Sequence, residues 1–208
     1  MNRAEHLVME ERHMDKLYAS SNFAVRWFFN RRLDTVVGLL PHGQMKVLDA
    51  GCGEGHLLQM LRAKNPESEL HGLDILDSAL RQADQRIPSA CLRQGDVCCL
   101  PYHDDEFNAV FCSDVLEHIH DYPIAIAEIK RVIKPGGHLI VINPNETLWT
   151  MARFVLGRRP VKVPDHVNDF SDKQIARAVG WTVAVQKNLP FGLPFRLSLC
   201  TVMKFEKP

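Results

Sequence analysis

The fold is decided by the stretch Lys46-Val47-Leu48-Asp49-Ala50-Gly51-Cys52-Gly53-Glu54-Gly55-His56-Leu57-Leu58. A short β-type run leads into three glycines at every second position, and leucines with helical spacing follow. A strand that passes through a glycine turn into a helix is how an open α/β sheet builds a ligand site at the carboxyl end of a strand. Glycine lets the backbone approach a ligand closely, and the free N–H groups at the helix start would meet that ligand.

The glycine spacing and one neighbouring charge favour a particular ligand. The dinucleotide fingerprint is G-x-G-x-x-G with an acidic residue about 20 positions later. Here the glycines run G-x-G-x-G, and His56 stands where the third glycine would be. Asp49 would repel a pyrophosphate and attract a ligand that carries an ammonium and a sulfonium but no phosphate. S-adenosylmethionine has this chemistry, so the electrostatics favour it over NAD.

The glycine stretch and four later segments resemble, in the same order, the motifs of class I S-adenosylmethionine-dependent methyltransferases of the type 11-like family. The later segments are Gly72-Leu73-Asp74-Ile75, Gly95-Asp96-Val97, Phe107 to Ile119, and Lys134-Pro135-Gly136-Gly137-His138-Leu139. One departure is Asn108, where the family usually has Asp, and that position serves the strand rather than the chemistry. Five motifs in the right order are a specific signal, whereas a lone glycine motif would be a weak one.

The resemblance implies a Rossmann-like, doubly wound α/β fold with three α-β-α layers. Its seven-stranded sheet would be mostly parallel with an antiparallel last strand. The family's cofactor is S-adenosylmethionine, whose ribose hydroxyls would be held by Asp74 and whose adenine amino group would be held by Asp96. The expected cofactor-binding residues are Asp49, Gly51, Cys52, Gly53, Asp74, Ile75, Asp96, Val97 and Ser113.

The composition is that of an ordinary globular chain. Hydrophobic residues make up 46% and charged residues 24% of 208 residues, which suits one domain with a large core. Lys plus Arg equals Asp plus Glu, at 25 each, so nothing drives the chain toward nucleic acid or an anionic membrane in general. The six cysteines form no C-x-x-C pair, which disfavours a cysteine zinc site and favours free thiols.

The N-terminal segment is too rich in charge and histidine for a secretory signal, and no run approaches the roughly 18 apolar residues of a membrane span. We therefore expect a cytoplasmic protein. We predict a single methyltransferase domain in four parts. These are a helical cap (1–43), a cofactor-binding core (44–144), a lid insertion (145–170) and a C-terminal helix with a hairpin (171–208).

The cap is expected to form two helices that break near Ser20-Ser21-Asn22, and its aromatic and basic residues have two interpretations. In the first, Tyr18, Trp27 and the pair Arg31-Arg32 line the ligand cleft. In the second, Trp27 and Phe28 pack on the sheet and the arginines lie in water. Toward the other end of the chain, the second strand of the closing hairpin is predicted over residues 196–206, with Leu197 on its apolar face.

Methyl transfer is an in-line displacement, so the protein mainly positions the acceptor and excludes water. A base is needed only for an acceptor that arrives protonated. His118 is the catalytic candidate, oriented by Glu117 or Asp114, and a structural role is the alternative, because this Glu-His pair recurs in family members with unrelated acceptors. A metal site of Asp114, Glu117 and His118 is a further alternative, similar to some quinone-type O-methyltransferases. We predict no metal.

Two features of the lid bear on the acceptor. His166 lies in a segment that resembles a family segment near the acceptor pocket, where a functional and a structural role are equally supported. The one basic concentration in the chain consists of Arg153, Arg158, Arg159 and Lys162. It would grip an anionic acceptor, meet a lipid surface, or form a solvated edge of the lid.

The function that the sequence favours is transfer of a methyl group from S-adenosylmethionine to a small-molecule acceptor, anionic or lipid-like. Nucleic acid is not expected as a partner. A catalytically silent subunit that binds S-adenosylmethionine is the first alternative, because the cofactor residues say nothing of the acceptor site. An NAD-dependent oxidoreductase is the least favoured, because the glycine spacing and Asp49 oppose it.

Overall fold

The structure is a computed structural model, which describes residues 13–155 and 166–208. Its centre is a seven-stranded sheet in the order β3-β2-β1-β4-β5-β7-β6. The strands are β1 (Lys46–Ala50), β2 (Glu69–Asp74), β3 (Cys91–Gln94), β4 (Phe107–Ser113), β5 (Ile133–Pro144), β6 (Thr182–Leu189) and β7 (Cys200–Glu206). The first five strands are parallel, and β7 is antiparallel to both of its neighbours. The predicted fold class is confirmed.

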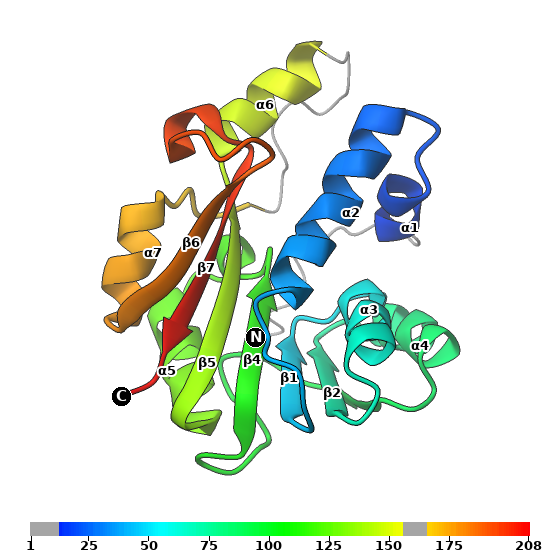
Figure 1. Cartoon of the computed structure of the whole chain (residues 1–208), viewed down its shortest axis with the longest axis vertical. Helices are drawn as coiled ribbons and strands as arrows, with labels where there is room; N and C mark the ends of the chain where they lie inside the picture. The colour runs from blue at the N-terminus through cyan, green and yellow to red at the C-terminus, as the bar shows by residue number, and fades with distance from the viewer. Residues whose placement is uncertain (1–12, 156–165) are drawn as a thin grey trace.

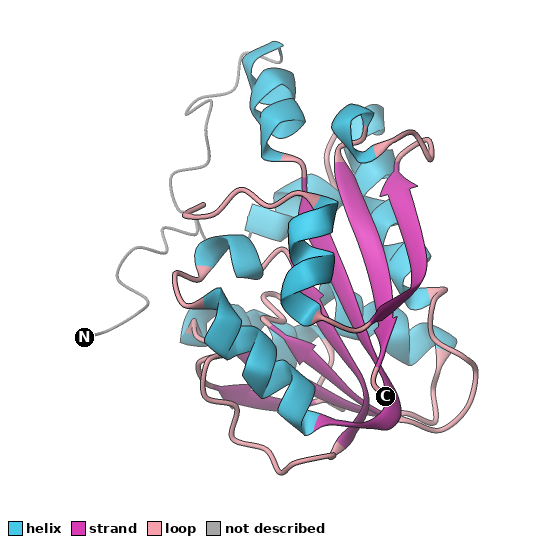
Figure 2. Cartoon of the chain, turned by 90° about the vertical axis from the view of Figure 1, so that its left-hand side faces the viewer, coloured by secondary structure: helices cyan, strands magenta, loops and turns pink. Residues whose placement is uncertain are grey.

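Helices cover both faces of this sheet (Figures 1 and 2). They are α1 (His13–Tyr18), α2 (Phe23–Val37), α3 (His56–Lys64), α4 (Asp77–Arg86), α5 (Tyr122–Val132), α6 (Glu146–Val155) and α7 (Asp172–Val179), with 3-10 turns η1 (Leu116–His118) and η2 (Phe195–Leu197). The apolar residues of α2, α3 and α4 pack on one face, and those of α5 and α7 pack on the other. Within the described ranges, no helix has the length and apolar character needed to cross a bilayer.

The central strands are buried on both faces, which explains their mostly apolar sequence. Val47 and Leu48 are both fully buried, and they belong to the cores on opposite faces of the sheet. Alternate residues of a strand point to opposite faces, so a strand covered by helices on both sides is mostly apolar. Asp49 is a buried polar residue within β1. This burial fixes where β1 ends and therefore where the glycine loop begins.

The N-terminal helices extend beyond the carboxyl ends of β1 and β4 (Figure 1). They are separated at residues 19–22, as predicted, and the Asn22 side chain caps α2 by accepting the N–H groups of Ala24 and Val25. At the start of α1, the Glu54 carboxylate accepts the N–H groups of Met14 and Asp15. Because Glu54 belongs to the glycine loop, α1 is attached to that loop. The part of the predicted helical cap that precedes residue 13 lies outside the described residues.

The hairpin at the C-terminus differs from the prediction in one respect. Residues 195–197 form the turn η2, and the strand begins only at Cys200. The turn is closed by the buried Ser198, whose hydroxyl donates to the carbonyl of Leu193 at 2.8 Å. Leu197 is consequently 63% exposed and does not belong to the apolar face.

Candidate active site

The glycine loop is joined to the end of the neighbouring strand by backbone hydrogen bonds. The N–H groups of Gly51 and Cys52 both donate to the carbonyl of Leu73, at 2.7 and 2.9 Å. The N–H of Gly53 donates to the Asp74 carboxylate at 2.8 Å. The loop after β1 therefore lies against the carboxyl end of β2, at the edge of the sheet where parallel α/β folds bind ligands.

Two glycines of this loop have different surroundings. Gly51 has a φ of +85°, and a Cβ atom there would lie 2.3 Å from Cγ2 of Val115, so the position admits only glycine without rearrangement. Gly53 has a φ of +50°, and a Cβ atom there would meet no other atom within 4 Å. The first glycine serves packing within the protein. The second faces open space that a ligand can occupy.

Asp49 provides the charge at the base of this loop. Its side chain is 2% exposed, and its Oδ1 atom has no hydrogen-bond partner among the described residues. Burial, with a smaller contribution from the charge of Asp74, raises the pKa of Asp49 to about 8. A buried carboxyl group without a partner is unfavourable unless a ligand supplies one. The ammonium of S-adenosylmethionine fits this requirement.

The other expected cofactor residues also lie at the carboxyl edge of the sheet. Asp74 accepts the N–H of Leu76 with its second oxygen at 2.9 Å, and Asp96 accepts the N–H of Cys98 at 2.8 Å. Ser113 ends β4, and its hydroxyl has no hydrogen-bond partner among the described residues. Cys52 and Val97 are buried, while Ile75 follows β2 in a turn. Their binding role remains a prediction, but the fold brings them to one edge.

An ion pair connects the cap to this edge. Arg32 of α2 is 4% exposed and pairs with Asp114, whose φ of +53° turns the chain from β4 toward η1. The interpretation that both arginines lie in water is therefore wrong for Arg32. Trp27 is 38% exposed rather than packed on the sheet, and the guanidinium of Arg31 lies 5.9 Å from its ring centroid.

Tyr18, at the end of α1, lies among these charged groups. Its ring is 4.3 Å from that of His56 and 5.7 Å from that of Phe29, measured between centroids. Burial raises the pKa of the Tyr18 hydroxyl, the Arg32 charge lowers it, and the nearby carboxylates of Asp114 and Asp49 raise it further. The cap therefore places a phenol near the base of the glycine loop, and a role of Tyr18 in lining the ligand cleft stays a prediction.

A second group of polar residues follows β4 and β5, and we name it the Glu-His cluster. It consists of Glu117, His118, Glu146 and His166. The ligand atoms of Glu117, His118 and His166 lie within 4.8 Å of one another. The two imidazole rings are nearly perpendicular, with centroids 4.6 Å apart. Nδ1 of His166 lies 2.7 Å from Oε1 of Glu146.

Both carboxylates of the Glu-His cluster are buried. Glu117 is 2% and Glu146 6% exposed. Burial, and then the neighbouring charge of Asp114, raises the pKa of Glu117 well above its ordinary value. Sequence reasoning missed Glu146, although a carboxylate two residues after a buried strand at the ligand edge was the available signal.

The segment that carries His166 is fixed onto η1. The N–H groups of Val167 and Asn168 donate to the carbonyl of Glu117 at 2.8 and 3.0 Å. The side chain of Asn168 also donates to the carbonyls of Leu116 and Ile119. His166 is thus held by backbone contacts on both sides of His118. Of the predicted basic concentration, Arg153 is on α6, whereas Arg158, Arg159 and Lys162 lie outside the described residues.

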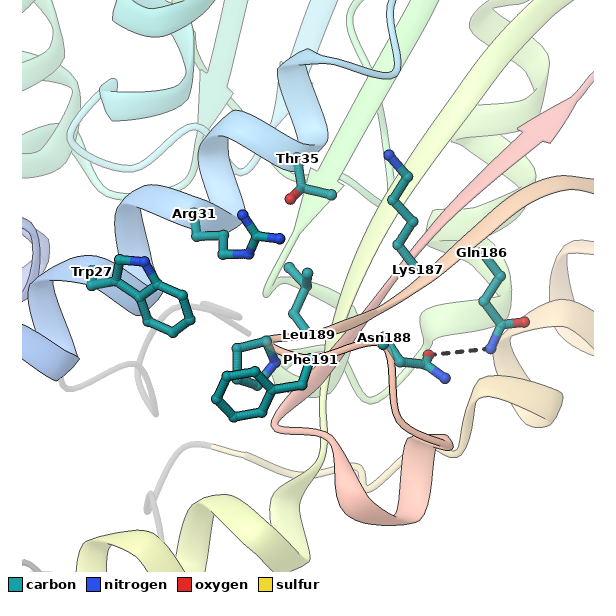
Figure 3. A pocket seen from close by; sticks show the side chains of 10 residues that line it. Trp27, Arg31, Thr35, Gln186, Lys187, Asn188, Leu189 and Phe191 are labelled. Carbon is teal, nitrogen blue, oxygen red and sulfur yellow. Dashed lines mark hydrogen bonds between the residues drawn. The ribbon is translucent and has the colours of Figure 1, made fainter.

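A cleft of about 550 Å³ opens between α2 and the end of β6 (Figure 3). Trp27 and Arg31 face Leu189 and Phe191 across it, and Lys187 adds a second positive charge. The rings of Trp27 and Phe191 lie 6.1 Å apart, and Phe191 is 74% exposed. The lining residues include none of the expected cofactor residues.

Comparison with known proteins agrees with this architecture. A family described as "Methyltransferase domain" matches residues 41–185. A demethylmenaquinone methyltransferase from Deinococcus radiodurans is 35% identical over 108 residues, covering 50% of this chain and 45% of that protein. A malonyl-[acyl-carrier protein] O-methyltransferase from Erwinia billingiae is 28% identical over 162 residues, covering 76% and 63%. The chain spans about half the length of the first curated relatives it matches.

Solved structures share the fold at low sequence identity. One is an S-adenosylmethionine-dependent methyltransferase from Mesorhizobium loti, with a TM-score of 0.68 and 14% identity. The alignment covers 85% of this chain and 98% of that one. At this identity the similarity shows the fold alone.

Proposed function

The chain belongs to the class I S-adenosylmethionine-dependent methyltransferases, and from this membership we propose that it transfers a methyl group to a small acceptor, anionic or lipid-like. The observation that carries the proposal is the buried Asp49 carboxyl group, whose Oδ1 lacks a partner beside a loop with open space at Gly53. A positively charged amino acid group suits that carboxylate, and a pyrophosphate does not.

In this proposal the cofactor supplies an activated methyl group and its own leaving group. Asp49 pairs with the ammonium of the cofactor, and the backbone at Gly51 and Gly53 lies along the methionine part of the cofactor. Asp74 accepts from the ribose hydroxyls, and Asp96 accepts from the adenine amino group. The carboxylates of Asp74 and Asp96 each already accept a backbone N–H and have further lone pairs for a ligand. Ile75, Val97, Cys52 and Ser113 complete the expected set of contacts.

His118 is the residue that we assign to the acceptor. It lies in η1, directly after β4, and its ring is held against that of His166. A neutral imidazole there would take the proton of an acceptor hydroxyl or ammonium before the methyl group is transferred. The rest of the catalytic effect would come from positioning the acceptor and excluding water.

Two observations support an acceptor that is anionic or lipid-like. The cleft between α2 and β6 combines exposed aromatic rings with the cations Arg31 and Lys187. Among the relatives, one is named for demethylmenaquinone and another for the malonyl group of a carrier protein. An apolar acceptor would contact Trp27 and Phe191, and an acidic one would pair with the two cations.

The alternative is a subunit of the same family that binds the cofactor without turnover. Calorimetry with S-adenosylmethionine, S-adenosylhomocysteine and NAD tests the donor. We expect S-adenosylmethionine and S-adenosylhomocysteine to bind and NAD not to bind. If neither sulfur compound binds, the proposal is refuted. Methyl-labelled cofactor incubated with fractionated cell extract then tests turnover. Label transferred by the wild type and not by His118→Gln supports an enzyme, whereas binding without any transfer supports the silent subunit.

A further inference from the structure

The Glu-His cluster contains more unsatisfied polar atoms than a packed core retains. Oε1 of Glu117, both carboxylate oxygens of Glu146 and Nδ1 of His166 have no hydrogen-bond partner among the described residues. Their side chains are nine-tenths buried or close to it. Buried polar atoms in folded proteins are almost always paired, so a group of this kind indicates a missing ligand.

The geometry within the cluster identifies the type of ligand. Nδ1 of His166 and Oε1 of Glu146 form an ion pair at 2.7 Å, although neither atom has a hydrogen-bond partner among the described residues. Donor atoms that lie this close together without hydrogen bonds are typical of groups that bind a shared third atom. Glu117 and His118 bring two more donor atoms within 4.8 Å of a ligand atom of His166.

The charges also point to a cation. Glu117 and Glu146 lie in one buried region with Asp114, and the cation Arg32 pairs with Asp114. Arg32 also acts on Glu117, but it is already paired with Asp114, and the ion-pair partner of Glu146 is the ring of His166. An ion with two positive charges would balance the two glutamates, whereas an additional anion would not.

We propose that this cluster binds one divalent transition-metal ion through four side chains: Glu117, His118, Glu146 and His166. Two imidazoles and two carboxylates are a set that suits Zn²⁺, Mn²⁺ or Fe²⁺, whereas Mg²⁺ and Ca²⁺ prefer oxygen alone. Bonds of about 2.0–2.2 Å would place neighbouring donors about 3–4 Å apart. The ligand atoms of Glu117, His118 and His166 already lie within 4.8 Å of one another, and Oε1 of Glu146 lies 2.7 Å from Nδ1 of His166.

The backbone holds the donors where such a site requires them. Val167 and Asn168 attach the His166 segment to the carbonyl of Glu117, so residues far apart in sequence are fixed relative to each other. Glu146 begins α6 directly after β5. This differs from the metal alternative considered for the sequence, because Asp114 is paired with Arg32.

Another His and carboxylate group in the described part of the chain gives a contrast. Asp15, Glu54 and His56 lie equally close together. However, Glu54 accepts two backbone N–H groups and Asp15 pairs with Arg86 at 2.6 Å. The carboxylates of this second group already have partners within the protein, so the group has the structural role of attaching α1 to the glycine loop.

The chemical consequence rests on the proposed methyltransferase function. An ion at the cluster would hold an oxygen of the acceptor and lower the pKa of its hydroxyl, whose proton would pass to solvent before the oxygen takes the methyl group. His118 would then act as a ligand of the ion rather than as the base. The acceptors favoured are those with an enol, a phenol or a carboxylate that can bind a metal.

Metal binding can be measured without any turnover. Protein freed of metal by a chelator is titrated with Zn²⁺, Mn²⁺ and Mg²⁺ by calorimetry, and its thermal unfolding is followed with each ion. We expect one equivalent of Zn²⁺ or Mn²⁺ to bind and to raise the melting temperature, with Mg²⁺ weaker by about tenfold or more. His166→Gln and Glu146→Gln should each weaken the binding by about tenfold or more. The exposed His103→Gln should leave the affinity unchanged.

Each outcome decides the proposal. No heat with any transition-metal ion in the wild type, or equal affinity in His103→Gln and His166→Gln, would overturn it, whatever the stability of the variants. Binding of S-adenosylhomocysteine in the same samples shows that each variant is folded. It also separates this proposal from the proposed function, because loss of metal binding with normal cofactor binding concerns the cluster alone.

Discussion

Arg32 and Asp114 are 82 residues apart in the chain and form an ion pair at the carboxyl edge of the sheet, in which Arg32 is buried and Asp114 is partly exposed. Arg32 also lies over the ring of Phe29, with its guanidinium carbon 5.1 Å from the centroid. The pair therefore attaches α2 to the residue at which β4 turns into η1. Cap, glycine loop and Glu-His cluster meet around this contact.

Replacing Arg32 with Met should destabilise the protein strongly. The change leaves the Asp114 carboxylate without its partner, and because that side chain is only 29% exposed the loss should cost about 1–3 kcal/mol. Urea denaturation measures the loss of unfolding free energy. Arg31→Met is the matched control, because Arg31 lies on the cleft side of the same helix, and it should change stability by less than about 0.5 kcal/mol. Similar losses in both variants would show that the ion pair is unimportant.

Asp49 should make cofactor binding depend on pH. Its pKa of about 8 in the folded protein means that it is mostly protonated at neutral pH. An ammonium favours the ionised carboxylate, so binding below pH 8 should release a proton, and affinity should rise with pH until about 8. Calorimetry in buffers of different ionisation enthalpy measures the proton. The Asp49→Asn variant should bind the cofactor weakly, without releasing a proton and without the rise in affinity with pH.

The same residue makes a prediction for the unliganded protein. Because folding raises the pKa of Asp49 from 3.8 to about 8, its contribution to stability is fully present below pH 3.8 and is lost as the pH rises through 8. As the pH rises across that range, the unfolding free energy of the wild type should therefore fall relative to that of Asp49→Asn. A constant difference would contradict the burial of this carboxyl group.

Two alanine substitutions in the glycine loop should separate packing from binding. Gly51→Ala forces a Cβ against Val115 at a positive φ and should cost about 1–3 kcal/mol of stability. Gly53→Ala meets no protein atom and should cost only about 1–2 kcal/mol from its backbone angle. Because that Cβ enters the space assigned to the cofactor, its affinity should fall by about tenfold or more. Unchanged affinity in Gly53→Ala would mean that the cofactor lies elsewhere.

Asp74→Ala and Asp96→Ala should each weaken cofactor binding by about 1–3 kcal/mol, through lost buried hydrogen bonds. The effects on stability should differ. Asp74 accepts the N–H groups of both Gly53 and Leu76, so its loss should also loosen the glycine loop. Calorimetry and urea denaturation on the two variants give the comparison, and normal affinity in both would show that the site is misplaced.

Much of the core followed from local pattern. The β-type run that begins at Lys46 is the observed β1, because a central parallel strand is mostly apolar and the glycines end it. The break between α1 and α2 follows from residues that act on their own neighbours, such as Asn22, which caps α2. Such features depend on interactions within a few residues.

The site was less predictable where distant segments meet. Arginine is rarely buried, so the sequence favours an exposed Arg32, and only the contact with Asp114 explains its position. The neighbouring Glu146 and His166 are 20 residues apart, and no periodic pattern connects them. Leu197 kept the alternation of a strand, but the bond from Ser198 to the carbonyl of Leu193 formed a turn instead.

The burial of the cysteines gives the protein an internal reporter of folding. Cys91 and Cys99 are exposed, whereas Cys52, Cys98, Cys112 and Cys200 are buried. Burial also raises the pKa of the thiols at 52, 112 and 200, which slows their reaction with electrophiles. A thiol reagent should therefore modify two sites quickly in the native protein and six after denaturation. Labelling stoichiometry would follow unfolding in every variant described above, and storage in air should link molecules through the exposed pair.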